Sequence, residues 1–322
     1  MDSTDRRMSE PTRGFVHRQL SKYPHLVAGS SAGIFSTFLL HPLDLVKTRF
    51  QVNEGMQRSA VVPSYRSTWN AFRTIASYEG VHALYQGVPT AVLGSGLSWG
   101  LYFFLYERAK LQYSQYQTNP GSNEKLPAWA HMLCGTQAGA MTVMVTNPIW
   151  LIKTRLQLQV SDAERSRLKL ASGSAPRYRG FLHAVRTIVS TEGPLALYRG
   201  LVPALFLTSH GALQFVIYEE LKSWSIEMHG ELGTMMPMFL GAASKVCAST
   251  ATYPYQVIKA RIQRLTLEGE VPYKGTLDCA RRTFQQEGML GFYKGLAPNL
   301  IRIAPAAGVT FLVYENIAAK LR

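Results

Sequence analysis

Acidic residues are scarce in this 322-residue chain, where 20 aspartates and glutamates face 34 lysines and arginines and leave a net charge of +14. An excess of this size indicates an anionic partner, either a nucleic acid, a membrane surface or a negatively charged solute. Cysteine is rare as well. Cys134, Cys247 and Cys279 form an odd, widely spaced set, which excludes a disulfide framework and a zinc site, so we expect buried thiols.

The chain also lacks the short motifs that mark the common enzyme classes. It has no Gly-x-Gly-x-x-Gly dinucleotide motif, no phosphate-binding P-loop, no His-Glu-x-x-His zinc motif and no set of residues suited to nucleophilic catalysis. A nucleic-acid-binding protein would hold its basic residues in one continuous patch beside aromatics, whereas uncharged segments separate them here. The sequence therefore predicts no catalytic residue, metal site, enzyme cofactor or nucleic-acid partner.

The first 22 residues contain no apolar run. They mix Asp2, Asp5 and Glu10 with several basic residues, a composition that excludes a secretory signal and argues against a cleaved targeting presequence. We interpret residues 1–22 as a polar N-terminal tail.

Long segments without charge follow this tail. A membrane-spanning helix needs about 20 mostly uncharged residues, and six segments qualify, the last two less clearly. Their Gly, Ser, Thr and Ala content suits closely packed helices around a polar cavity; the alternative is a large soluble protein with buried helices. The segments are 23–43, 80–106, 126–152, 200–218, 232–258, which contains Lys245, and 303–314, which follows Arg302.

Basic residues are concentrated in alternate connections between these segments. Segments 45–86, 151–199 and 257–294 together hold 21 basic and 9 acidic residues, whereas 107–125 and 219–231 hold 4 basic and 6 acidic ones. Such a bias places the three longer connections on one face of a membrane. With six spans, both termini lie on the opposite face.

An eight-residue pattern recurs three times at an interval of 106 residues: Pro42–Arg49, Pro148–Arg155 and Pro254–Arg261. Each copy begins with proline and ends with two basic residues that are separated by one other residue. Repeats at a fixed period mark a chain that is built from similar structural units.

Two further elements recur in the same register. An acid-Gly pair precedes an aromatic-x-Gly triplet, and a Tyr-Glu pair ends each even-numbered span. The acid-Gly pairs begin at Glu79, Glu192 and Glu287, the triplets end at Gly87, Gly200 and Gly295, and the Tyr-Glu pairs begin at Tyr106, Tyr218 and Tyr314.

From about Tyr23 to Arg322, the chain resembles the mitochondrial carrier family, whose repeated pattern is Pro-x-acid-x-x-base, acid-Gly and aromatic-base-Gly. The resemblance implies an all-α membrane protein with six tilted helices in a threefold pseudo-symmetric barrel and three short matrix helices. The repeats would span residues 23–125, 126–231 and 232–322. It also implies a monomeric alternating-access transporter in the mitochondrial inner membrane, with both termini facing the intermembrane space and cardiolipin as a bound lipid.

The prolines predict a constriction at the matrix end of the cavity. A proline inside a helix removes a backbone hydrogen bond and kinks the helix, so Pro42, Pro148 and Pro254 would draw the odd-numbered helices together. In the family, the acid of one repeat pairs there with the base of the next, which implies a pair between Asp44 and Lys153.

Two acids of this matrix gate are replaced. Trp150 and Gln256 stand at acid positions, so Lys259 lacks a carboxylate partner and Lys47 faces only an amide. We expect one ion pair and a gate held partly by hydrogen bonds. At the cytoplasmic gate, the family pattern implies pairs of Glu107 with Lys222 and of Glu315 with Lys110. Glu219 is then left without a partner, because Ala318 replaces its base.

The family binds its solute midway through the cavity, seven residues after the glycine of each aromatic-x-Gly triplet. Arg302 is the sharpest candidate, because an arginine within a membrane tends to face water or an anion; a structural pairing is the alternative. The positions implied are Gly94, Leu207 and Arg302, with Ser95 and Thr208 beside them.

Lys245 is a second candidate. It lies 11 residues before Gln256, about 20° from a whole number of helical turns, so both residues share one helix face. The other repeats have Gly33 and Gly139 at this position. Lys245 contacts either the solute or a structural ion partner. Trp150 either stacks on a flat ring or packs at the gate, and His210 and Gln214 are further candidates.

Several longer stretches resemble the folate and flavin-nucleotide carrier branch of the family: residues 96–104, 146–150, 208–215, 251–256 and 291–302. The resemblance implies transport of an anionic flat-ring solute, FAD or folate. Trp150 is shared with pyrimidine-nucleotide and NAD carriers, so these solutes remain alternatives, as does a peroxisomal carrier of nucleotide cofactors. The choice between exchange and uniport stays open.

Overall fold

The structure is a computed structural model that describes residues 24–54, 65–116, 127–160, 177–230, 233, 235–266, 272–303, 305–306, 313 and 316. The predicted N-terminal tail, Glu315 and most of the last predicted span lie outside these residues. Within them, the chain forms helices and no strand.

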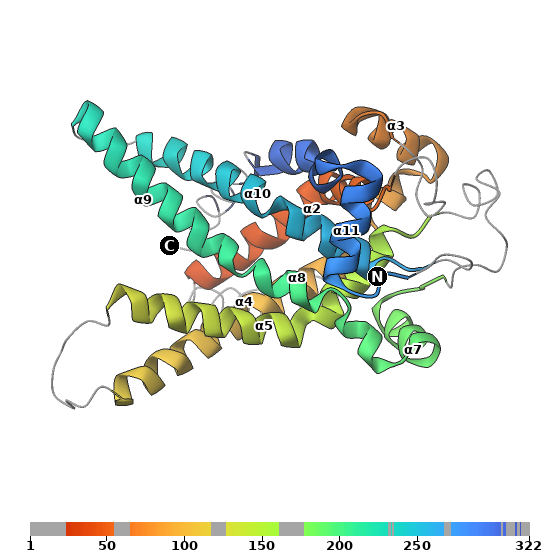
Figure 1. The fold of residues 1–322 in the computed structure, drawn as a ribbon, viewed down its shortest axis with the longest axis horizontal. Helices are drawn as coiled ribbons and strands as arrows, with labels where there is room; N and C mark the ends of the chain where they lie inside the picture. The colour runs from red at the N-terminus through yellow and green to blue at the C-terminus, as the bar shows by residue number, and fades with distance from the viewer. Residues whose placement is uncertain are drawn as a thin grey trace, which may run out of the picture.

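Long helices make up the body of the molecule (Figure 1). They diverge toward one end, termed the open end, and converge at the other, termed the narrow end. Residues 296–303 are also helical. The long helices are α2 (Pro24–Gln51), α4 (Val88–Tyr116), α5 (Ala128–Gln157), α8 (Leu201–Phe206) with α9 (Ser209–His229), and α10 (Met236–Gln263).

Short helices lie at the narrow end, each followed by a 3₁₀ turn (Figure 1). Each packs on the end of the preceding proline-containing helix and buries a separate apolar cluster there, such as Leu45 with Ile75 and Ile152 with Ile188. The short elements are α3 (Thr68–Tyr78), α7 (Phe181–Glu192) and α11 (Thr276–Glu287), with η1 (Val81–Tyr85), η2 (Pro194–Tyr198) and η3 (Met289–Tyr293).

The outward faces of the long helices are apolar and exposed. Trp99, Phe103, Phe215 and Phe239 are each more than half exposed, as expected of side chains that meet lipid. Two helical stretches, Val81–Ser114 and Pro194–Met228, are long and apolar enough to cross a membrane by length and composition. The proline-containing helices carry basic residues in their last turns, which lowers their mean hydropathy.

Three buried arginines connect each repeat to the next. Arg49 pairs with Glu79 of its own repeat and donates from Nε to the carbonyl oxygen of Gln157 in the next (3.2 Å). Arg155 likewise pairs with Glu192 and donates from Nε to the carbonyl oxygen of Gln263 (3.1 Å). Arg261 pairs with Glu287 and donates from Nε to the carbonyl oxygen of Gln51 (3.0 Å). The third link returns to the first repeat, so the contacts close a ring.

Two carboxylates of this ring, Glu192 and Glu287, stay ionised. Burial alone would raise the pKa of Glu287, but hydrogen bonds and charge from Arg261 and Lys294 hold it below its ordinary value. The pKa of Glu192 is lowered in the same way, because Arg155 and Arg199 outweigh the cost of burial.

Glycine is required where α4, α8 and the helical segment 296–303 begin. Gly295 has a φ of +85°, a conformation that strains other residues. A Cβ atom there would lie 2.9 Å from the carbonyl oxygen of Lys47, and one at Gly200 (φ +78°) would lie 2.9 Å from Gln263 Cγ. The aromatic-x-Gly triplets therefore let the backbones of neighbouring repeats approach closely.

The expectation of three buried thiols is wrong for Cys247. Cys134 and Cys279 are buried, whereas Cys247 is exposed, because it lies on the outward side of α10. Burial raises the pKa of the Cys279 thiol to about 12, so this thiol is inert at neutral pH.

The arginine ring predicts unequal effects of two substitutions on α11. Glu287→Gln should lower the free energy of unfolding by about 3 kcal/mol, because it leaves Arg261 as a buried charge without its carboxylate. Asp278→Asn removes a charge from a more exposed pair with Arg282 and should leave the melting temperature nearly unchanged. Thermal unfolding of the detergent-purified variants measures both, and equal losses would contradict this account.

Candidate functional site

Side chains from all three repeats meet where α2, α5 and α10 converge. Lys153 forms an ion pair with Asp44, whose carboxylate also accepts a hydrogen bond from Gln157 Nε2 (3.0 Å). Lys47 donates to Gln256 Oε1 (2.9 Å). The first contact joins repeats 1 and 2 and the second joins repeats 1 and 3, so these residues form a gate that is closed at the narrow end.

The third connection of the gate is absent from the described residues. Lys259 makes no hydrogen bond or ion pair there, and Trp150 occupies the position of its expected acid. The Trp150 indole donates to Ser98 Oγ (3.3 Å), and the Lys153 ammonium lies 5.8 Å from the centre of its ring. The gate thus contains three lysines and a single carboxylate.

A second layer of glutamines, which the sequence analysis did not identify, lies beneath the gate. Thr48 donates to Gln157 Oε1 (2.9 Å) and Thr154 to Gln263 Oε1 (3.2 Å). Gln51, Gln157 and Gln263 each follow the repeated proline by nine residues. The 106-residue repeat therefore already marked them as equivalent positions. Ala260 replaces the third threonine, and this layer is therefore also asymmetric.

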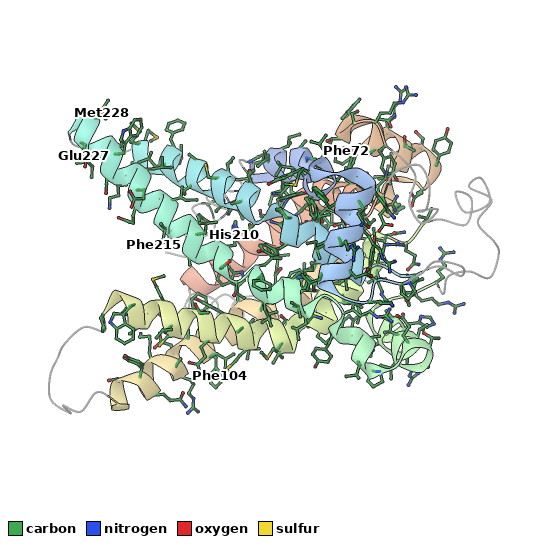
Figure 2. The ribbon with its side chains drawn as sticks, viewed as in Figure 1. Phe72, Phe104, His210, Phe215, Glu227 and Met228 are labelled. Carbon is green, nitrogen blue, oxygen red and sulfur yellow. The ribbon has the colours of Figure 1, made fainter. Side chains whose placement is uncertain are left out.

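A cavity of about 300 Å³ lies at the gate and is lined both by gate residues and by residues of the glutamine layer. His210 reaches it from α9, near the middle of the molecule in Figure 2, and its Nδ1 lies 3.0 Å from Thr252 Oγ1. The lining residues are Asp44, Lys47, Thr48, Gln51, Trp150, Lys153, Thr154, Leu207, His210, Gln256, Lys259, Ala260 and Gln263. Most are polar or charged, so the cavity suits a hydrated, anionic guest.

Arg302 and Lys245 are not among the residues that line this cavity, but each acts electrostatically on residues that are. Arg302 is half-buried and acts electrostatically on Asp44, Lys47 and Tyr253. Its Nε atom is buried and has no hydrogen-bond partner in the described part of the chain. Lys245 is exposed and acts electrostatically on His210, which lines the cavity.

Three further solute-site candidates, Gly94, Leu207 and Thr208, lie beside Trp150. A Cβ atom at Gly94 would be 3.2 Å from Ile149 Cγ2 and 3.5 Å from Trp150 Cζ2, so Gly94 lies close to both side chains. Leu207 and Thr208 line a side cavity of about 170 Å³ together with Trp150, and Ser95 is half-buried on α4. The structure therefore gathers Gly94, Leu207 and Thr208 around one aromatic ring.

At the open end, the described gate residues pair within their own helices. Lys110 Nζ lies 3.2 Å from Glu107 Oε1, and Lys222 Nζ lies 3.8 Å from Glu219 Oε2. These contacts are exposed, and Glu107 is not joined to Lys222. The open-end gate is therefore not formed in this conformation, and Glu315 lies outside the described residues.

The three repeats are also found by comparison with known proteins. A family model for the mitochondrial carrier protein matches residues 18–117, 124–229 and 230–322, almost the whole chain. The chain belongs to the mitochondrial carrier family. Because members of this family are transporters, the protein is a transporter and not an enzyme.

Relatives within the mitochondrial carrier family transport different solutes, according to their names. Chloroplastic folate transporter 1 of Arabidopsis thaliana is 42% identical, covering 94% of this chain and 96% of that protein. Chloroplastic nicotinamide adenine dinucleotide transporter 1 of the same plant is 34% identical, covering 90% and 89%. The mitochondrial FAD carrier of Saccharomyces cerevisiae is 29% identical, covering 95% and 99%.

The incomplete gate predicts that Gln256→Glu slows transport. A carboxylate would convert the hydrogen bond to Lys47 into an ion pair and stabilise the closed gate by about 1 kcal/mol, equivalent to an approximately fivefold slower opening. Solute uptake into vesicles measures the rate. Gln256→Ala serves as the control, since it removes the hydrogen bond and should open more readily, and a faster or unchanged rate for Gln256→Glu contradicts the prediction.

Proposed function

We propose that the chain is an alternating-access carrier of an anionic flat-ring solute, either folate or FAD. In this proposal, six tilted helices form a threefold barrel, and α3, α7 and α11 lie on its matrix side. Folate ranks first because the folate transporter is 42% identical over 94% of the chain, against 29% for the FAD carrier.

The observation that carries this proposal is the charge of the central cavity. Lys47, Lys153 and Lys259 line it with Asp44 as the single carboxylate among the lining residues, and Arg302 acts on Asp44 and Lys47 as a further positive charge. A cation within a membrane is costly unless an anion or water faces it. An anionic solute would complete this arrangement, with Arg302 as a planar, bidentate anchor for carboxylate or phosphate.

The environment of Trp150 supports a solute with a flat ring. The indole donates to Ser98 and lies close to Gly94, and Trp150 lines the cavity. A fixed aromatic ring favours stacking with a planar group. Leu207 and His210 border the same space.

The direction of the observed opening supports alternating access. The narrow-end gate joins different repeats, whereas the described residues at the open end pair only within helices. We interpret the conformation as open to the intermembrane space. Transport then requires the narrow-end contacts to break while Glu107 and Lys222 come together.

Two grooves support a role for an anionic lipid. One of about 730 Å³ includes Gly87 and Gly180 at the starts of α4 and α7, and one of about 540 Å³ includes Gly200 and Gly275 at the starts of α8 and α11. Free N–H groups at helix starts bind phosphate. We propose cardiolipin at these grooves, residence in the mitochondrial inner membrane and function as a monomer.

NAD is the second candidate solute. Two plant relatives named as nicotinamide adenine dinucleotide transporters are 34% and 33% identical to this chain. NAD shares with folate and FAD a planar ring and anionic groups, so the same cavity accommodates its chemistry.

The decisive experiment compares uptake of labelled folate, FAD, NAD and a pyrimidine nucleotide into vesicles that contain the purified chain. We expect selective uptake of folate or FAD, and Arg302→Ala should reduce it by about tenfold or more because a charged hydrogen-bonding partner is lost. Arg73→Ala, which removes an exposed cation on α3, is the matched control. Selective NAD or nucleotide uptake would contradict the proposed solute class.

A further inference from the structure

Besides the exposed Lys245, two cations near the central cavity have no hydrogen-bond or ion-pair partner in the part of the chain that is described. One is Arg302, in the helical segment 296–303, and the other is Lys259, on α10. Both act electrostatically on Lys47. By contrast, Lys47 itself is held by Gln256 and Lys153 by Asp44.

Lys259 lines two cavities. It lines the central cavity and also the side cavity of about 170 Å³, and Trp150 and Leu207 border both. The side cavity continues between α5 and α8 along Asn147 and Thr208. The Lys259 ammonium is therefore accessible from the place where a solute would contact the Trp150 ring.

The missing partner of Lys259 has a specific cause. The Asp44 and Gln256 positions each supply an oxygen atom to a lysine of a neighbouring repeat, but the equivalent position for Lys259 carries an indole. An indole has a single N–H donor and no acceptor, and that donor is engaged by Ser98. A half-buried lysine without an acceptor is costly unless an anion completes its site.

We propose that Lys259 is a second anion anchor, so that the solute is held through two separate anionic groups, one at Arg302 and one at Lys259. The second group is a carboxylate or phosphate, and it supplies the negative charge that Trp150 cannot. This inference rests on the proposed transport of an anionic solute, but not on which solute that is. It explains how a gate with one ion pair stays specific: the lysine that the gate leaves without a partner is used for recognition.

The proposal separates solutes by the number of their anionic groups. Folate has two carboxylates and pteroate has one; FAD has two phosphates and FMN has one; NAD has two phosphates and nicotinamide mononucleotide has one. Ligand-dependent shifts in the melting temperature of the purified chain report affinity without requiring transport. Each pair is measured on the unaltered chain and on the variants, so the test holds for whichever solute the chain binds.

In the unaltered chain, the solute with two anionic groups should bind about tenfold or more tightly than its partner with one. Lys259→Met should remove this difference. Trp150→Glu should remove it as well, since the new carboxylate occupies Lys259. Gln256→Glu makes the same change of charge beside Lys47, which already has a partner, and should keep most of the difference, as should Arg73→Met on the exposed face of α3.

Two results would overturn the proposal. One is an undiminished preference for two anionic groups in Lys259→Met. The other is a Trp150→Glu variant with slower turnover and unchanged affinity, which would assign Lys259 to gate closure alone. If neither folate nor FAD binds but NAD shows the pattern, the second anchor stands and the proposed solute class fails.

Discussion

The rest of the structure depends on three buried arginines that each hold two repeats at once. Arg49, Arg155 and Arg261 bind a glutamate of their own repeat and a backbone carbonyl of the next. Removing a guanidinium from water is expensive unless acceptors replace the lost hydration. The chain meets this demand with contacts that pass from repeat to repeat until the ring closes. The narrow end is thereby fixed as one unit, and the kinked helices above it are brought to a common point.

Above this symmetric ring, the structure becomes progressively asymmetric. The glutamine layer has two of its three threonine partners, because Ala260 replaces the third. The gate has one ion pair and one hydrogen bond, and Trp150 replaces the remaining acceptor. The departures from threefold symmetry therefore increase toward the cavity. A solute without threefold symmetry requires such a site, whereas the ring below it performs the same structural task in each repeat.

The asymmetry also separates residues that hold the gate from residues that are available to a guest. Lys153 and Lys47 face oxygen atoms of neighbouring repeats, while Lys259 and Arg302 have no described partner. Trp150 connects both groups, because it bonds to Ser98, packs on Gly94 and lines the two cavities. The two roles that the sequence left open for this tryptophan, packing at the gate and contact with a flat ring, are thus compatible in one position.

The sequence by itself determined the repeats, the family, the kink positions and the residues at the gate, because a period of 106 residues and repeated prolines are local features of the chain. It also contained the glutamines at the same period, although their role becomes visible only when they face a threonine of another repeat. The tertiary structure alone decided which end is closed, that Cys247 is exposed, and that Lys259 faces a space shared with Trp150. These properties depend on how helices far apart in sequence are placed against each other, and the same pattern of residues is compatible with either end being closed.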